Sequence, residues 1–225
     1  MAFELKKDWK DIGLQMNNLK DKCNSIIKLI DLPDDDIRVM AIIHVRQFCN
    51  TIAATAIRMQ YMASNNDNIP ILMQLYGVKE VDHIKSILTD LNPNLKISFI
   101  TMVQFALENC LERVLCALPR ERGQNAFSKT LKKIINVLEL EHPEEKHTLL
   151  MVPAWIRNTL HAGGIHTKAD VQVTIGGENF IFQQGKRVEC ASWSHIFYVL
   201  LKSLDVYKEI LTSEFVTAIE KIEAE

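Results

Sequence analysis

Residues 95–118, LKISFITMVQFALENCLERVLCAL, decide the fold of this chain. Apolar side chains dominate the segment, which indicates a helix at the centre of a helical bundle. Helical periodicity recurs on both sides of it. Further helices are predicted over residues 4–30, 69–76, 79–91, 125–140, 144–162, 192–211 and 214–223. A long helix that begins at the start signal Leu32-Pro33-Asp34-Asp35-Asp36 and runs to about Ala63 is also predicted. Pro153 lies inside the pattern of 144–162 and predicts a kink or a new helix start there.

The periodicity changes after Gly163-Gly164. Residues 170–175 (DVQVTI) alternate with a period of two, Gly176-Gly177 is a turn signal, and residues 178–183 (ENFIFQ) are the returning strand. A third short strand is predicted over residues 187–190. The fold class is therefore mainly α, a helical bundle with a small β-hairpin at about residues 170–190.

The segment Leu91-Asn92-Pro93-Asn94 predicts a break between helices, because proline cannot donate to the helical hydrogen-bond ladder. This break divides the chain into an N-terminal helical region, 1–92, and a C-terminal helical domain, 94–225.

Composition places the chain among ordinary globular proteins. It has 225 residues, 48% hydrophobic and 24% charged, with a formal net charge of −2, so no overall basic field points to nucleic acid. The five cysteines form no C-x-x-C pair, which favours reduced thiols, and no signal core or membrane-length apolar run is evident. We expect a cytoplasmic protein with no membrane partner. The seven histidines show no zincin spacing, so no metal or cofactor is predicted.

The strongest functional signal is residues 154–164, AWIRNTLHAGG, which place Arg157 and His161 four positions apart before a Gly-Gly helix stop. Residues at this spacing share one helix face. Arg157 provides a permanent cation with a forked set of donors, and His161 exchanges a proton near neutral pH. The pair suits a phosphodiester site, although basic residues in a last helical turn also serve simply to match the helix dipole.

Arg157-Asn158 followed by His161, on a late helix of an all-α bundle, resembles the HEPN superfamily over about residues 94–212. The upstream helix with Phe105, Glu108, Glu112 and Arg113, the glycines after the motif, the strand pair and the Trp193 helix add to this resemblance. Three residues separate Arg157 from His161, where the family pattern has four to six. Many HEPN proteins are metal-independent ribonucleases of toxin–antitoxin and antiviral defence systems, and they act as dimers in which two Arg–His pairs meet.

The resemblance implies an RNA-cleaving homodimer with an antitoxin or defence-system partner. Arg157 would grip the phosphate, His161 would transfer the proton, and Asn158 and Glu108 would orient them. Arg120, Arg122 and His166 are further candidate substrate-binding residues; the Arg120-Glu121-Arg122 cluster also fits a solvated face. Two alternatives stay open: a non-catalytic HEPN module that binds nucleotide, RNA or a partner protein, and a structural helical partner such as the neutralising subunit of an operon pair.

Overall fold

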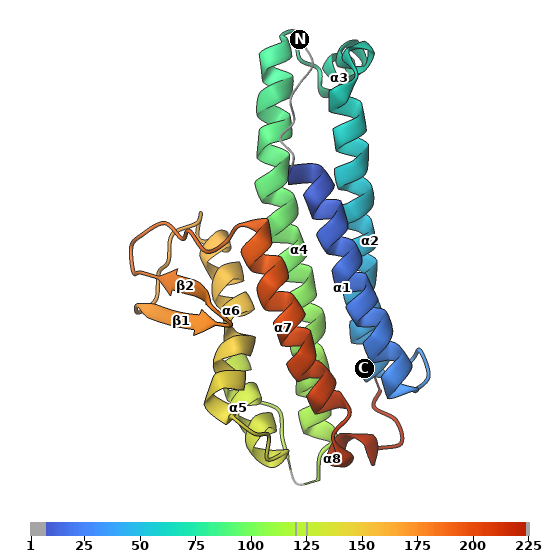
Figure 1. The fold of residues 1–225 in the computed structure, drawn as a ribbon, viewed down its shortest axis with the longest axis vertical. Coiled ribbons are helices and arrows are strands. Elements are labelled where there is room, and N and C mark those ends of the chain that lie inside the picture. The colour runs from blue at the N-terminus through green and yellow to red at the C-terminus, as the bar shows by residue number, and fades with distance from the viewer. Residues whose placement is uncertain (1–7, 120, 125, 224–225) are drawn as a thin grey trace.

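The computed structural model describes residues 8–119, 121–124 and 126–223, and it is mainly helical with one small antiparallel sheet (Figure 1). The mainly α prediction is thereby confirmed. The elements are α1 (Asp8–Ile30), α2 (Ile37–Ser64), a 3₁₀ turn (Asn66–Asn68), α3 (Ile69–Tyr76), α4 (Val81–Ala117), α5 (Phe127–Val137), α6 (Pro143–His161), β1 (Val171–Ile175), β2 (Glu178–Phe182), α7 (Trp193–Leu211) and α8 (Glu214–Thr217).

The long helices α1, α2, α4 and α7 form a bundle, and α5, α6 and the hairpin cover one side of it (Figure 1). α1 packs against α2 and α7, and α6 packs against α4, α5 and α7. α2 and α4 extend beyond the ends of α1 and α7, and α3 connects them at this end (Figure 1).

One hydrophobic core runs through both predicted regions of the chain, from Ile12 in α1 to Ile222 near the C-terminus. α1 contributes because its apolar residues recur every three or four positions, which places them on one face. The fully or almost fully buried residues of this face are Ile12, Met16, Leu19, Cys23 and Ile26. Residues before position 92 thus pack directly on the core of the later helices.

The predicted helix break at residues 91–94 is wrong, because α4 continues from Val81 to Ala117 with Pro93 inside it. An interior proline costs about 3 kcal/mol, so packing must hold the helix on both sides. Before Pro93, Ile84 is completely buried in a small cluster with Leu72 of α3. After it, Phe99 packs against Trp193 of α7 with ring centroids 5.9 Å apart. Tertiary contacts therefore outweigh the local signal, and the expected domain boundary falls within a continuous helix.

The predicted hairpin is confirmed, with β1 and β2 paired from Val171↔Phe182 to Ile175↔Glu178. Phe180 and Phe182 are completely buried, and the hydroxyl of Tyr198 in α7 donates to the carbonyl of Ile175, which ties the turn to the bundle. The predicted third strand is absent from the described residues: position 187 forms only an isolated bridge with Ile165.

The structure also decides the predictions for α6 and α8. α6 runs through Pro153 as a single helix and does not start again there. α8 is a single turn, Glu214–Thr217, in place of the predicted helix over 214–223. Because residues 1–7 lie outside the described part, the predicted start of the first helix at residue 4 lies there too.

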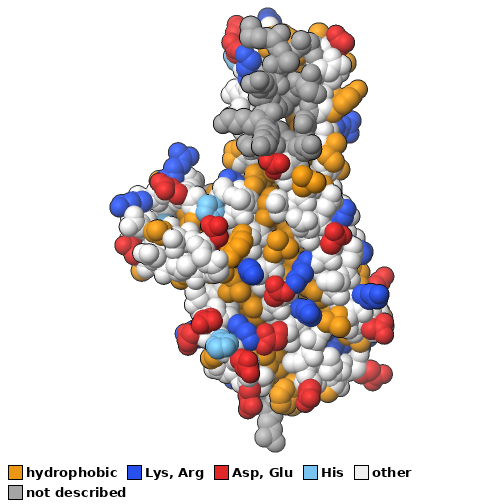
Figure 2. Space-filling view, viewed as in Figure 1, with side chains coloured by type: hydrophobic (Ala, Val, Ile, Leu, Met, Phe, Trp, Pro, Cys, Tyr) orange, Lys and Arg blue, Asp and Glu red, His pale blue; other side chains and the backbone are white. Residues whose placement is uncertain are grey.

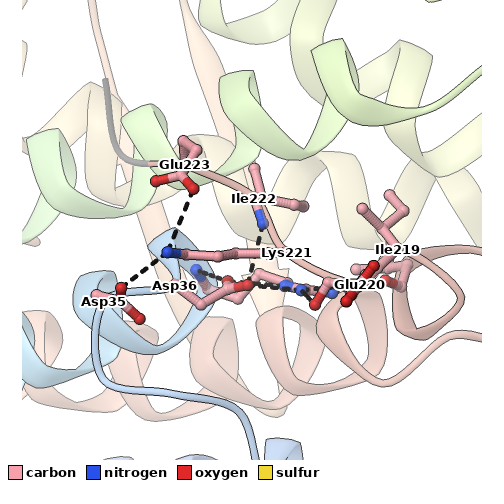
Figure 3. Close-up of polar contacts among 9 residues, drawn as sticks. Asp35, Asp36, Ile219, Glu220, Lys221, Ile222 and Glu223 are labelled. Carbon is pink, nitrogen blue, oxygen red and sulfur yellow. Dashed lines mark hydrogen bonds and ion pairs between the residues drawn. The ribbon is translucent and has the colours of Figure 1, made fainter.

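The C-terminal segment is clamped to the start of α2 by a buried ion pair (Figure 3). Arg38 Nη2 lies 2.6 Å from Asp36 Oδ2, and both side chains are 0% exposed. The guanidinium also donates to the carbonyls of Val216 (2.7 Å) and Ile219 (3.0 Å), and the Ile222 N–H donates to Asp36 (3.1 Å). The pair thereby satisfies backbone groups of a chain segment about 180 residues away in sequence.

Candidate functional site

α4 and α6 bring Arg157 and Glu108 together on one face of the molecule. Arg157 Nη1 donates to Glu108 Oε1 at 2.9 Å, with the two side chains 15% and 23% exposed. Gln104 Nε2 donates to the same carboxylate oxygen at 3.0 Å. Glu108 is held from two sides, so Arg157 is anchored in a defined position. Glu108 is thus in direct contact with Arg157.

The remainder of the Arg157 guanidinium is also positioned. Its Nε donates to Asn158 Oδ1 at 3.2 Å, and its central carbon lies 5.6 Å from the centroid of the Phe105 ring, a cation–π contact. Nη2 has no hydrogen-bond partner among the described residues. The side chain is therefore fixed at two nitrogens and keeps donor capacity for an anion.

His161 occupies the last turn of α6 and is exposed. Its ring Nε2 lies 2.8 Å from Thr101 Oγ1 of α4. The helix ends there because Gly163 and Gly164 adopt φ values of 70° and 84°, a left-handed conformation that glycine accepts readily.

The spacing on each helix explains why these groups meet. Thr101, Phe105 and Glu108 follow one another at intervals of four and three residues on α4, and Arg157 and His161 are four apart on α6. Each set therefore shares one face, and the two helices pack together. We call this surface, made of Thr101, Gln104, Phe105, Glu108, Arg157, Asn158 and His161, the α4–α6 face.

Sequence reasoning missed Thr101 and Gln104 as members of this face. Both lie within two helical turns of Glu108, at i−7 and i−4. Their helical spacing from Glu108 was the available signal. The choice of which α4 face meets α6 required the tertiary structure.

His166 does not lie on the same surface. It is only 3% exposed, its Nδ1 lies 3.1 Å from Thr159 Oγ1, and its Nε2 lies 3.0 Å from the Ala169 carbonyl. Its ring also packs on Phe182, with centroids 5.4 Å apart. Both ring nitrogens have hydrogen-bond partners within the protein. His166 is therefore a buried residue beneath the hairpin, whereas the sequence analysis predicted a contact with substrate.

Arg122 of the predicted basic cluster is exposed in the loop after α4. This loop folds back along α4, because the backbone N–H of Gln124 donates to Glu112 Oε1 at 3.1 Å, one helical turn from Glu108. Arg120 lies outside the described residues. Acidic and basic side chains are interspersed over the surface seen in Figure 2. With a formal net charge of −2, the chain has no overall basic field, so any nucleic-acid contact must be local.

Four of the five cysteines are buried, and the described residues include no metal-binding cluster. All five cysteines are free, and burial raises the pKa of Cys23, Cys49 and Cys110 to about 12, which keeps those thiols protonated. Among the residues that the structure describes, no group of three or more His, Cys, Asp or Glu side chains is arranged to hold a metal ion.

Three cavities of about 640, 570 and 410 Å³ lie elsewhere on the molecule. None of these three is lined by Arg157, Asn158 or His161. The α4–α6 face is thus separate from these three cavities. It is open to solvent, because Phe105 and His161 are exposed.

No family model matches the chain, and comparisons with curated proteins and with solved structures find no match either. The resemblance of the Arg157–His161 segment to HEPN proteins therefore stays a prediction from the residues themselves. Within the described ranges, no helix has the length and apolar character needed to span a membrane.

Proposed function

We propose that the chain is a metal-independent endoribonuclease of HEPN type that acts as a homodimer in a toxin–antitoxin or phage-defence system. The observation that carries this proposal is the α4–α6 face. There an anchored arginine with a free donor nitrogen and an exposed histidine lie one helical turn apart, about 6 Å along the axis.

In the proposed reaction the ribose 2′-oxygen attacks the adjacent phosphorus, and the bond from phosphorus to the 5′-oxygen breaks. The products are a 2′,3′-cyclic phosphate and a 5′-hydroxyl. Arg157 stabilises the negative charge on the phosphoryl oxygens, since a fixed donor is most effective where charge develops. Protonated His161 donates to the departing 5′-oxygen as general acid. In a dimer, the same residue of the second copy accepts the 2′-hydroxyl proton.

The proposal is tested by incubating the purified chain with end-labelled single-stranded RNA and tRNA in EDTA. We expect cleavage without divalent metal and products that carry 2′,3′-cyclic phosphate ends. A folded dimer that leaves both substrates intact, alone and with cell extract supplied as a source of activator, would contradict the proposed activity.

The proposed dimer interface includes Met102 and Phe105, which are 45% and 56% exposed on α4. The Phe105 ring contacts the Arg157 guanidinium. Large exposed apolar side chains next to a polar site are typical of a surface that a partner covers. A two-fold contact between α4–α6 faces would bring two Arg–His pairs together, as the HEPN resemblance implies.

We predict that Met102→Glu converts the dimer to a monomer, because the variant places two carboxylates in an apolar interface. Analytical ultracentrifugation measures the change. Ile181→Glu is the matched control, since Ile181 is a similarly exposed apolar residue (43%) on β2. A wild-type chain that sediments as a monomer at micromolar concentration, or a dimer that persists in Met102→Glu, would exclude this interface.

A second candidate function is favoured by the ion pair of Arg157 with Glu108, which neutralises much of the charge at the site. In this case the chain is a non-catalytic module that binds RNA, nucleotide or a partner protein. We then expect Arg157→Met to weaken RNA binding at least tenfold by fluorescence anisotropy, with His161→Ala binding as wild type and no cleavage by any variant. Cleavage by wild type would exclude this candidate.

A further inference from the structure

A cavity of about 570 Å³ lies between α1, α4 and the first turn of α7, and it is separate from the α4–α6 face. Leu14 of α1, Pro93 and Lys96 of α4, and Trp193 and Phe197 of α7 contribute to its lining. Its volume is in the range of small-ligand sites, roughly 300–1,000 Å³.

One wall of this cavity is aromatic and held in place. The rings of Trp193 and Phe197 are stacked, with centroids 5.4 Å apart and planes inclined by 19°. Phe99 supports Trp193 from within the core. Trp193 Nε1 donates to Asn92 Oδ1 at 2.6 Å, which fixes the orientation of the indole. This wall is therefore a preformed apolar surface that loses little conformational entropy when a flat molecule binds.

Lys96 adds a positive charge to the lining. Its side chain is partly buried, and it has no hydrogen-bond or ion-pair partner among the described residues. Burial lowers the pKa of its ammonium, which reflects the free-energy cost of removing an uncompensated cation from water. Asp11, the other charged residue of the lining, is exposed, and no ion pair between it and Lys96 is found. An anion beside Lys96 would relieve this cost.

We propose that this cavity binds a small planar organic anion, with its phosphate or carboxylate group at Lys96 and its flat body against Trp193. The cavity supplies an aromatic wall for the ring and a single cation for the charge, and the two lie on adjacent helices around one space. This binding site does not depend on the proposed ribonuclease activity.

Two anionic probes test the proposal: adenosine 5′-monophosphate and 1-naphthoate, each with its neutral counterpart, adenosine and 1-naphthalenemethanol. The readout is the indole N–H signal of Trp193 in ¹H–¹⁵N NMR spectra of the full chain, assigned with Trp193→Phe. We expect at least one anion to shift this signal saturably and to bind at least tenfold more tightly than its neutral counterpart. Binding of only the nucleotide identifies a phosphate ligand, and binding of only 1-naphthoate identifies a carboxylate ligand.

Lys96→Met is expected to weaken the binding of that anion at least tenfold, because it removes the charge and keeps much of the side-chain length. Lys202→Met is the matched control, since Lys202 is an exposed lysine of α7 outside this cavity. Lys96→Gln is the second variant if Lys96→Met does not fold. No saturable shift with either anion, equal affinity for anionic and neutral probes, or equal binding by the Lys96 and Lys202 variants would overturn the proposal.

Discussion

Replacing His161 by alanine is expected to lower the rate of RNA cleavage by about 10²–10⁴-fold, the usual contribution of a positioned general acid or base. The fold should survive, because His161 is exposed and its side-chain hydrogen-bond contact is with Thr101. The measurement is the initial cleavage rate of end-labelled RNA in EDTA, together with the thermal unfolding midpoint of each protein.

His83→Ala is the matched control for His161→Ala. His83 is also an exposed helical histidine, but it lies near the start of α4, eighteen residues before Thr101, about 27 Å along the helix axis. We expect this variant to cleave RNA as wild type does. A His161→Ala protein that retains wild-type activity would remove His161 from the proposed mechanism, whatever the chain does to RNA.

Replacing Arg38 by methionine is expected to lower the free energy of unfolding by about 3–5 kcal/mol, since it leaves the buried Asp36 carboxylate without its partner. It also removes the donors that satisfy the carbonyls of Val216 and Ile219. For a chain of this length the unfolding midpoint should fall by roughly 6–20 °C. Urea titration and thermal unfolding measure the two quantities.

The matched control is Lys221→Met. Lys221 forms exposed ion pairs with Asp35 (2.8 Å) and Glu223 (3.2 Å) close to the buried pair (Figure 3). Exposed ion pairs contribute only about 0–1 kcal/mol, so this variant should unfold almost as wild type does. Equal losses in the free energy of unfolding in Arg38→Met and Lys221→Met would show that the buried Asp36–Arg38 pair stabilises the fold no more than an exposed ion pair does.

The Asp36–Arg38 pair also predicts how stability depends on pH. Burial by itself raises the pKa of Asp36, but hydrogen bonds from the Arg38 side chain, the Arg38 N–H and the Ile222 N–H outweigh it, so the pKa lies below its ordinary value of 3.8. A carboxyl whose pKa is lower in the folded state stabilises the fold above its unfolded pKa, and this contribution disappears as pH falls through the folded pKa. The stability difference between wild type and Arg38→Met should therefore shrink below about pH 4.

Several features of the fold followed from local sequence patterns. Helical periodicity predicted a helix over residues 4–30, and Ile12, Met16 and Leu19 of this segment are buried in α1. Gly176-Gly177 between two alternating segments predicted a hairpin, and β1 and β2 pair there. Such features are readable because periodicity and turn chemistry involve residues that are close in sequence.

The residues of the candidate site could be predicted only in part from local sequence patterns. Helical spacing put Arg157 and His161 on one face, because a helix turns once in 3.6 residues. The partners of these two residues come from α4, about fifty and sixty residues earlier in the chain. Spacing within α6 carries no information about which face of another helix it meets, so Thr101 and Gln104 could not be assigned.

Tertiary structure alone decided the course of α4 and the place of His166. Pro93 is a typical local signal for a break, but the contacts of Ile84 and Phe99 keep the helix continuous across it. His166 follows the motif closely in sequence, yet the chain turns inward and its two ring nitrogens find partners beneath the hairpin. In both cases packing between distant segments supplies more free energy than the local preference that it overrides.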